Sequence, residues 1–288
     1  MNKTFISIII PVLNQINRIK KCIDAVKVQS YGIKNFEIIV VDNGSHDGSY
    51  EYLNSINNII LLKDESSKSP YVARNLGLSK AKSEIIVFLD VNCIPGINWL
   101  SSGINEMHTH NFDLIGGNVK FTLSKNSAAQ IFDSISNVKM RDSIIYRNVA
   151  KGGNLFIKRE VFNKLGNWPI ERSGGDVKFT KKATDSGFKL GYSEKAYVNY
   201  PARGFFPLIK KSFRVGKGIP NKNHLNSTKS KFSYFVGSLI NFPTSSDINN
   251  RILKRGNLIY QKKIFSLRLV GYCCQISTAF GVVLKNKI

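Results

Sequence analysis

A carboxylate and an amide stand directly behind a strand-like segment near residue 90. The segment at residues 84–89 is almost wholly apolar, and it ends in Asp90, with Asn92 two residues later. In a parallel α/β sheet, ligands bind beyond the carboxyl ends of the strands, so both side chains would face a site. Oxygen acceptors so placed suit a ribose hydroxyl or a divalent cation that holds a diphosphate. The alternative is a simple turn, since Pro95 and Gly96 follow closely.

The elements that would position these side chains alternate along the first part of the chain. Four strands are predicted, at residues 5–10, 36–41, 58–62 and 84–89. Helices are predicted between them: the first has apolar residues at helical spacing, the second begins at a Ser49 cap, and the third spans residues 71–81. This alternation indicates a doubly wound α/β sheet of the nucleotide-binding type.

Polar residues follow three of the four predicted strands. Asn14 comes after the first strand, Asp42 after the second and Asp90 after the fourth. Because a doubly wound sheet brings the carboxyl ends of its strands to one crevice, we expect these three side chains to face the same ligand.

Short motifs in series along the chain carry a resemblance to a known family. In order, they are Ser7-Ile-Ile-Ile-Pro-Val-Leu-Asn14, residues 38–49, Ala73-Arg-Asn-Leu-Gly77, residues 88–95, residues 152–160, residues 173–179 and Tyr200-Pro-Ala-Arg203. Their order and intervals resemble family 2 glycosyltransferases with the GT-A fold. The resemblance covers roughly residues 5–217 and implies a Rossmann-like, mixed and mainly parallel sheet flanked by helices.

The resemblance assigns roles to individual residues. Asp42 would hydrogen-bond the nucleobase, and Asp90 would meet the ribose or a metal-bound diphosphate. Asn92 occupies the second carboxylate position of the metal-binding Asp-x-Asp motif. Asp176 matches the general base that acts on the acceptor hydroxyl. The implied donor-binding set is Pro11, Asn14, Asp42, Asn43, Arg74, Asp90, Asn92, Gly153 and Asn154.

The chemistry of glycosyl transfer independently requires these residue types. A sugar linked to a nucleoside diphosphate has a good leaving group once a cation, Arg or Lys meets the developing charge. The incoming hydroxyl needs a base, and Asp176 at a loop-to-helix junction can serve. One base and one neutralised leaving group suffice for direct displacement with inversion. A retaining mechanism needs a carboxylate nucleophile, which the sequence does not identify.

Two departures from the family pattern concern the metal. The neutral amide of Asn92 replaces a carboxylate, and Asn199-Tyr200 stand where the family often has His. Hard cations prefer carboxylate oxygens, so we expect dependence on Mn²⁺ or Mg²⁺ to be weak or dispensable. Basic side chains would then stabilise the leaving diphosphate, and the candidates are Arg203, Arg214 and Lys217.

Chain length and cysteine spacing indicate the domain organisation and the redox compartment of the protein. The 288 residues suggest a glycosyltransferase domain at 1–220, with halves at 1–95 and 96–220, followed by a basic region at 221–288. The four cysteines have no metal or redox spacing, and no signal peptide is recognisable, so a reducing cytoplasm is expected.

Positive charge is concentrated toward the end of the chain. Residues 203–288 carry 16 Lys and Arg against the single acidic residue Asp247, whereas residues 1–202 carry 26 against 18. Residues 205–217 predict a basic amphipathic helix that would bind an anionic membrane surface, or pack on the catalytic domain, or both. The 16 uncharged residues at 269–284 are fewer than a span needs, which favours an interfacial or packed helix. No nucleic-acid-binding motif accompanies the charge.

The sequence therefore predicts an inverting glycosyltransferase of the hexosyltransferase type, peripheral at the cytoplasmic face of a membrane. Its partners would be a nucleotide sugar, a lipid-linked or cell-envelope glycan acceptor and anionic lipid. The alternative is a catalytically weak or inactive protein on the same fold that acts as a membrane-associated module binding nucleotide sugars or glycans. A nucleotidyltransferase would need a Gly-rich phosphate loop after the first strand, and Pro11-Val-Leu-Asn14 is not one.

Overall fold

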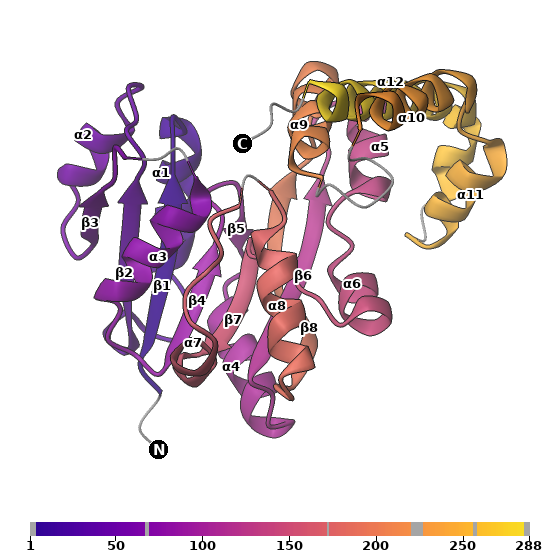
Figure 1. The fold of residues 1–288 in the computed structure, drawn as a ribbon. Helices are drawn as coiled ribbons and strands as arrows, with labels where there is room; N and C mark the ends of the chain where they lie inside the picture. Colours follow the sequence, from indigo (N-terminus) through magenta and orange to yellow (C-terminus); the bar gives the residue numbers. More distant parts are fainter. Residues whose placement is uncertain (1–3, 67–68, 172, 220–226, 256–257, 285–288) are drawn as a thin grey trace. The chain divides into compact units, whose positions relative to one another are not determined.

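The computed structural model describes residues 4–66, 69–171, 173–219, 227–255 and 258–284. Within them, an eight-stranded sheet has the order β3-β2-β1-β4-β7-β6-β8-β5 (Figure 1). Its strands are β1 (Ile6–Val12), β2 (Phe36–Asp42), β3 (Ile60–Lys63), β4 (Ile85–Leu89), β5 (Ile94–Pro95), β6 (Leu114–Thr122), β7 (Asn154–Lys158) and β8 (Leu190–Pro201).

The first four strands in sheet order, β3, β2, β1 and β4, run parallel. Every residue of β1 and β4 is buried. A strand that is covered on both faces has no polar side to show, which is why these segments are continuous apolar runs in the sequence. The four predicted strands are all observed, and their ends differ from the predictions by at most two residues.

The rest of the sheet contains antiparallel pairs. β7 pairs antiparallel with both β4 and β6, and β5 pairs antiparallel with β8. The mixed α/β fold predicted from the sequence is thereby confirmed. The β4–β7 pair matters most for function, because it sets Leu89 opposite Asn154 and so brings residues 152–154 beside the end of β4.

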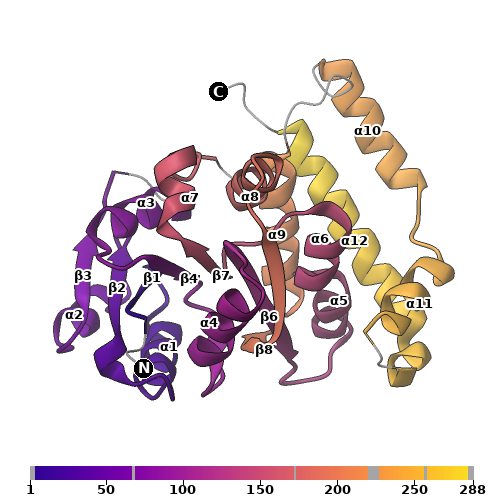
Figure 2. The same ribbon diagram turned by 90° about the horizontal axis from the view of Figure 1, so that it is seen from below.

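Helices cover both faces of this sheet. They are α1 (Ile16–Lys27), α2 (Ser49–Asn54), α3 (Pro70–Lys80), α4 (Trp99–Thr109), α6 (Met140–Arg147), α7 (Arg159–Leu165) and α8 (Gly175–Asp185). α1 and α4 lie on one face, and α3, α7 and α8 lie on the other (Figure 2). The second face holds an apolar core in which Phe88, Phe162, Trp168 and Phe179 pack ring against ring.

The start of α2 differs from the prediction. Gly48, with φ of 85°, is the N-cap, and Ser49 is the first residue of the helix. The Ser49 hydroxyl accepts a hydrogen bond from the Gln15 N–H at 3.2 Å and donates one to Asp47 at 2.5 Å. Its hydrogen bonds therefore join the loops that follow β1 and β2. The N-cap position is taken by Gly48, because glycine tolerates a positive φ.

The chain forms two compact units. The first contains the described residues up to Lys120 together with Lys139–Tyr200, and the second contains Phe121–Val138 and the described residues from Pro201 on. The second unit therefore begins before the predicted boundary at residue 220. Its described helices are α5 (Ala128–Ser136), α9 (Phe205–Gly218), α10 (Thr228–Ile240), α11 (Ser245–Leu253) and α12 (Ile264–Val283), with a 3₁₀ turn at Leu258–Lys263. Another 3₁₀ turn, at Ile33–Asn35, belongs to the first unit.

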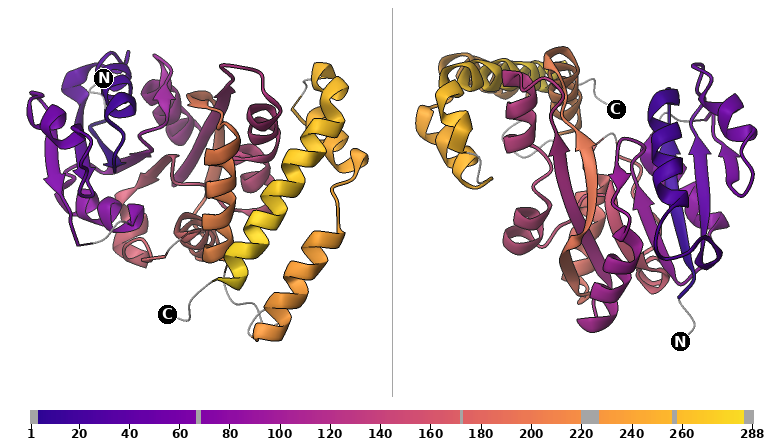
Figure 3. Two further views of the ribbon diagram at one scale, coloured as in Figure 1. Left: turned by 90° about the horizontal axis from the view of Figure 1, so that it is seen from above. Right: turned by 180° about the vertical axis from the view of Figure 1, so that it is seen from behind.

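Close packing of α9 with α12 explains why α9 groups with the C-terminal helices (Figure 3). A Cβ added at Gly216 would lie 2.0 Å from the Thr278 carbonyl oxygen, and one at Gly281 would lie 2.2 Å from that of Phe213. Only glycine lets the two backbones approach this closely. A separate apolar core contains residues of α5, α9, α11 and α12, among them Ile248, Ile252 and Leu267.

α12 is also long and apolar enough to cross a membrane. With the preceding turn it forms a 26-residue helical stretch at Leu258–Val283, whose most apolar 18-residue window has a mean hydropathy of 1.2, in the part of the chain that the structure describes. Of that window, 39% is buried inside the protein, and core helices of soluble proteins can match a span in length and composition. The length and composition of this helix are therefore weak support for a span.

Candidate functional site

The Asp42 carboxylate at the end of β2 is fully buried and fixed in orientation. Its Oδ1 accepts hydrogen bonds from the N–H groups of Gly44 and Ser45, at 3.0 and 2.9 Å. Gly44 has a φ of 79°, which lets the chain turn tightly around the carboxylate. Oδ2 is buried and has no hydrogen-bond partner among the described residues. A buried acceptor without a donor is costly, so a ligand N–H would be stabilised here.

The loops after β1 and β2 are tied together beside Asp42. The Asn14 side-chain oxygen accepts a hydrogen bond from the His46 N–H at 2.7 Å, and the Asn14 N–H donates to the Ser45 hydroxyl at 2.9 Å. Asn43 is buried and donates to the Ser69 carbonyl at 3.1 Å, while its own side-chain oxygen lacks a donor among the described residues. Pro11 lies buried in β1. The hydrogen bonds of Asn14 and Asn43 thus fix the loops beside Asp42.

Asp90, at the end of β4, forms an ion pair with Arg74. The Arg74 Nη2 lies 2.6 Å from the Asp90 Oδ1. The Arg74 side chain is only 5% exposed, whereas that of Asp90 is 42% exposed. The guanidinium also lies over the ring of Tyr71, at 5.4 Å, and that of Trp168, at 6.0 Å. The carboxylate therefore faces solvent on one side and a buried cation on the other.

Two consecutive glycines allow this arrangement. A Cβ added at Gly153 would lie 2.7 Å from the Asp90 Oδ2, and one at Gly152 would lie 3.2 Å from the Arg74 Cζ. The Gly153 carbonyl accepts a hydrogen bond from the Asp90 N–H at 3.1 Å. The segment that leads into β7 therefore passes directly against the ion pair, and larger side chains would separate it.

Asn154 has a packing role in the structure. Its amide nitrogen donates to the carbonyls of Asn118 and Ala196, both at 3.0 Å, and its oxygen accepts from the Trp99 indole at 2.8 Å. The side chain is fully buried and holds together β6, β7, β8 and α4. Its predicted contact with the donor stays a prediction, and the neighbouring Gly153 is the residue that lies against Asp90.

The residues that could hold a divalent cation form a sparse set. One oxygen of Asp90 is paired with Arg74, and Asn92 offers a neutral amide in the half-buried turn that follows. Among the described residues, no group of three or more His, Cys, Asp or Glu side chains is arranged to bind a metal. Mg²⁺ is commonly held by one or two carboxylates together with phosphate oxygens. Asp90 and Asn92 therefore fit a cation only if a bound diphosphate completes the coordination.

Asp176 lies in the first turn of α8, half-buried, with the positive-φ residue Gly174 as the N-cap. Its Oδ2 accepts a hydrogen bond from the Gly152 N–H at 2.9 Å, and its Oδ1 accepts from the Tyr71 hydroxyl at 3.1 Å. A carboxylate at a helix N-terminus is stabilised by the helix dipole. Residues 152–153 thus contact Asp90, Arg74 and Asp176 together.

The three basic residues predicted to meet the diphosphate all belong to the second unit. The Arg203 Nη1 lies 3.3 Å from the Asp133 Oδ2, and its N–H donates to the same oxygen at 2.8 Å. The Lys217 ammonium lies over the ring of Phe213 at 4.7 Å, and Arg214 is exposed. Their diphosphate role stays a prediction.

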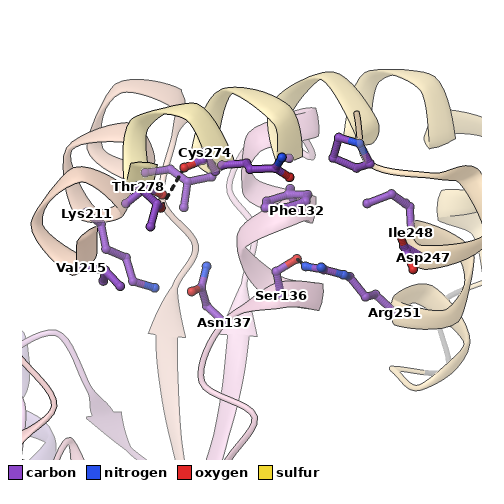
Figure 4. Close-up of a pocket in the computed structure, with 15 residues that line it drawn as sticks. Phe132, Ser136, Asn137, Lys211, Val215, Asp247, Ile248, Arg251, Cys274 and Thr278 are labelled. Carbon is purple, nitrogen blue, oxygen red and sulfur yellow. Dashed lines mark hydrogen bonds between the residues drawn. The ribbon is translucent and has the colours of Figure 1, made fainter. Parts of the chain in front are cut away.

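The second unit contains a cavity of about 330 Å³ between α5, α9, α11 and α12 (Figure 4). Lys211 and Arg251 extend into it from opposite sides. The Lys211 Nζ lies 3.9 Å from the buried Asp133 Oδ1, and Arg251 donates to the Ser136 hydroxyl at 3.0 Å. These bonds hold the C-terminal end of α5 against its neighbours.

Sequence reasoning did not identify Tyr71 or Trp168 as site residues. In the sequence Tyr71 is recognisable only as part of a predicted helix. Its hydroxyl donates to the carboxylate of Asp176, which lies 105 residues away along the chain. The one available signal was its spacing from Arg74, because residues three apart share a helix face.

Comparison with known proteins gives a consistent result. The model of the family described as "Glycosyl transferase family 2" matches residues 7–166. Glycosyltransferase AglE of Haloferax volcanii is 37% identical over 287 residues, which cover 96% of this chain and 94% of AglE. A poly(ribitol-phosphate) beta-glucosyltransferase of Bacillus spizizenii is 32% identical over 120 residues, or 40% of this chain and 19% of that protein.

A solved structure resembles the whole chain. It is the mannosyltransferase PcManGT from Pyrobaculum calidifontis, in complex with GDP-Man and Mn²⁺. The TM-score is 0.64 at 15% sequence identity, and the match covers 100% of this chain and 89% of PcManGT. At this identity the similarity establishes the fold.

Proposed function

Since the chain belongs to the family 2 glycosyltransferases and has their GT-A fold, we propose that it transfers a sugar from a nucleoside diphosphate sugar to a glycan hydroxyl with inversion. One observation carries this proposal: residues 152–153 lie against the Asp90–Arg74 pair and also donate a hydrogen bond to Asp176. A site for the diphosphate and a base for the acceptor therefore border the same short segment.

The donor would lie across the ends of β2 and β4. The unpartnered Asp42 Oδ2 would accept a hydrogen bond from the nucleobase. The Nε of Arg74 is likewise buried without an acceptor among the described residues, so this side chain can still bind a phosphate oxygen. Its positive charge would offset the charge that develops on the departing diphosphate.

In the transfer step, Asp176 takes the proton of the acceptor hydroxyl as that oxygen bonds to the anomeric carbon. The bond from the anomeric carbon to the diphosphate oxygen breaks on the opposite side, and its electron pair leaves with the nucleoside diphosphate. The configuration at the anomeric carbon inverts because a single displacement occurs. A Mn²⁺ or Mg²⁺ ion held by Asp90, with Asn92 as a weak partner, would add Lewis-acid stabilisation of the diphosphate when bound.

We infer that the acceptor is a cell-envelope or lipid-linked glycan. Support comes from the similarity to a poly(ribitol-phosphate) beta-glucosyltransferase, whose name describes glucose transfer to a polymer. The second unit adds physical support for work at an anionic membrane on the cytoplasmic side. Residues 203–288 carry 16 basic residues, and strongly exposed apolar side chains include Phe206, Ile240 and Phe265. Such a surface suits anionic lipid.

A panel of nucleotide sugars tests the proposal by thermal stabilisation and by release of the nucleoside diphosphate, each with and without Mn²⁺ or Mg²⁺. We expect at least one donor to stabilise the protein and to be consumed. Asp42→Asn should weaken its binding about tenfold or more, because a hydrogen bond to a buried carboxylate is lost. Asp185→Asn, an exposed α8 residue paired with Lys181, is the matched control. The proposal is wrong if no nucleotide sugar binds, or if both variants bind it normally.

A further inference from the structure

We propose that Tyr71 is a positioning residue that orients the Asp176 carboxylate for catalysis and selects which of its oxygens takes the proton. This inference rests on the proposed role of Asp176 as the base. The hydroxyl of Tyr71 donates to the Asp176 Oδ1 at 3.1 Å across two different helices, α3 and α8.

The Tyr71 ring is held firmly enough to serve this role. It is buried, its centroid lies 6.3 Å from that of Trp168, and the Arg74 guanidinium lies over it at 5.4 Å. On the side of α8, a Cβ added at Gly175 would lie 3.0 Å from the ring. This close approach at Gly175 brings the start of α8 near enough for Asp176 to reach the hydroxyl.

The hydrogen bonds of Asp176 leave its two oxygens unequal. Oδ1 accepts from the Tyr71 hydroxyl and also from the Val177 N–H at 2.9 Å. Oδ2 accepts from the Gly152 N–H. An ionised carboxylate has about four lone-pair sites, two on each oxygen. Among the described residues, the lone pair that remains is therefore on Oδ2, and the acceptor hydroxyl gives its proton to this oxygen.

The Tyr71 hydroxyl acts as a donor throughout the neutral range. Burial foremost, and then the negative charge of Asp176, raises the pKa of the Tyr71 hydroxyl to about 12. The phenol therefore remains protonated where the enzyme works and does not compete as a base.

One turn of α3 serves both ends of the reaction. Tyr71 holds the base, and Arg74, three residues later, holds Asp90 at the donor end. Residues at this spacing lie on the same face of a helix. The separation between the diphosphate site and the base is thereby set by a rigid element.

Tyr71→Phe tests the proposal, because it removes the hydroxyl and keeps the ring under Arg74. We expect kcat at pH 7 to fall about tenfold, with the donor KM within about twofold, because the ring still supports Arg74. Tyr31→Phe is the matched control: its buried hydroxyl donates to the Thr4 carbonyl at 2.6 Å.

A double variant separates this proposal from the assignment of the base. If Tyr71 acts through Asp176, Tyr71→Phe should cause no further loss in an Asp176→Asn background. If Asp176→Asn alone retains turnover, the assignment of the base is wrong. If Asp176→Asn is inactive while Tyr71→Phe matches Tyr31→Phe in kcat and in donor KM, the base stands and the role of Tyr71 is overturned.

Discussion

Gly153→Ala is expected to open the Asp90–Arg74 pair from the side of β7. The added methyl carbon would lie 2.7 Å from the Asp90 Oδ2 and 3.1 Å from its Cγ. Ordinary contact between non-bonded heavy atoms lies near 3.5 Å, so the carboxylate must move by several tenths of an ångström or more. Asp90 is 42% exposed and can swing outward, but this movement lengthens its 2.6 Å contact with the Arg74 guanidinium.

The size of the effect follows from the burial of the two partners. Breaking a fully buried ion pair costs about 3–5 kcal/mol, because a charge is left without a partner. Since Asp90 is partly in solvent, we expect about 2 kcal/mol of lost stability. For a chain of 288 residues that corresponds to a fall in Tm of about 3 °C. Donor affinity should fall with it, because both partners border the diphosphate site.

Thermal unfolding and calorimetric titration with the cognate nucleotide measure both effects. Gly237→Ala is the control, since a Cβ at this position in α10 has nothing within 4 Å. Alanine in a helix is favoured over glycine by about 0.5–1 kcal/mol, so this variant should be neutral or slightly stabilised. If Gly153→Ala matches Gly237→Ala in Tm and in nucleotide affinity, the close approach of β7 to the ion pair does not matter.

Three further predictions concern the base, the cation and the membrane. Asp176→Asn should lower turnover by about 10² or more with unchanged calorimetric donor affinity, and near-normal turnover contradicts the base assignment. Asn92→Asp should lower the half-saturating Mn²⁺ concentration by roughly tenfold in a metal titration of turnover. The prediction of a weak cation site is wrong if the unchanged protein requires a tightly bound cation and Asn92→Asp does not improve its binding. Phe206→Ser, Ile240→Ser and Phe265→Ser, at side chains 82%, 76% and 71% exposed, should weaken sedimentation with anionic vesicles, and added salt should weaken it further. Ile170→Ser, at a side chain of the first unit that is 72% exposed, should leave sedimentation with vesicles unchanged. If all four variants sediment equally, the proposed membrane role of the second unit is wrong.

The membrane test uses surface substitutions because a deletion would confuse two effects. Removing residues 225–288 would take away Ile248, Ile252 and Leu267, which form the core of the second unit with α5 and α9. Lost vesicle binding could then follow from unfolding. Exposed side chains can be changed with little effect on stability.

The sequence by itself determined the parallel half of the sheet and the types of residue at its strand ends. Strands buried on both faces must be apolar throughout, and this pattern is visible over a few residues without knowledge of the fold. Asp42 and Asp90 could be assigned to a crevice for the same reason, since the ends of parallel strands meet at one edge. The family motifs extended this prediction to Asp176.

Only the tertiary structure decided which of these residues contact one another. The partners of Asp90 and Asp176 lie 16 and 105 residues away, and no local periodicity encodes such pairings. The family motif assigns Asn154 to the donor. In the structure its amide donates hydrogen bonds to carbonyls of β6 and β8, because these strands meet around it.

The division of the chain was also decided in three dimensions. α9 has the charge pattern of a surface helix, yet it groups with α12 because Gly216 and Gly281 let their backbones touch. Glycine in a sequence indicates freedom of the backbone, and what that freedom permits depends on the segment that arrives opposite it. Local patterns thus fix the elements and their chemistry, while the contacts that turn them into a site depend on segments brought together by folding.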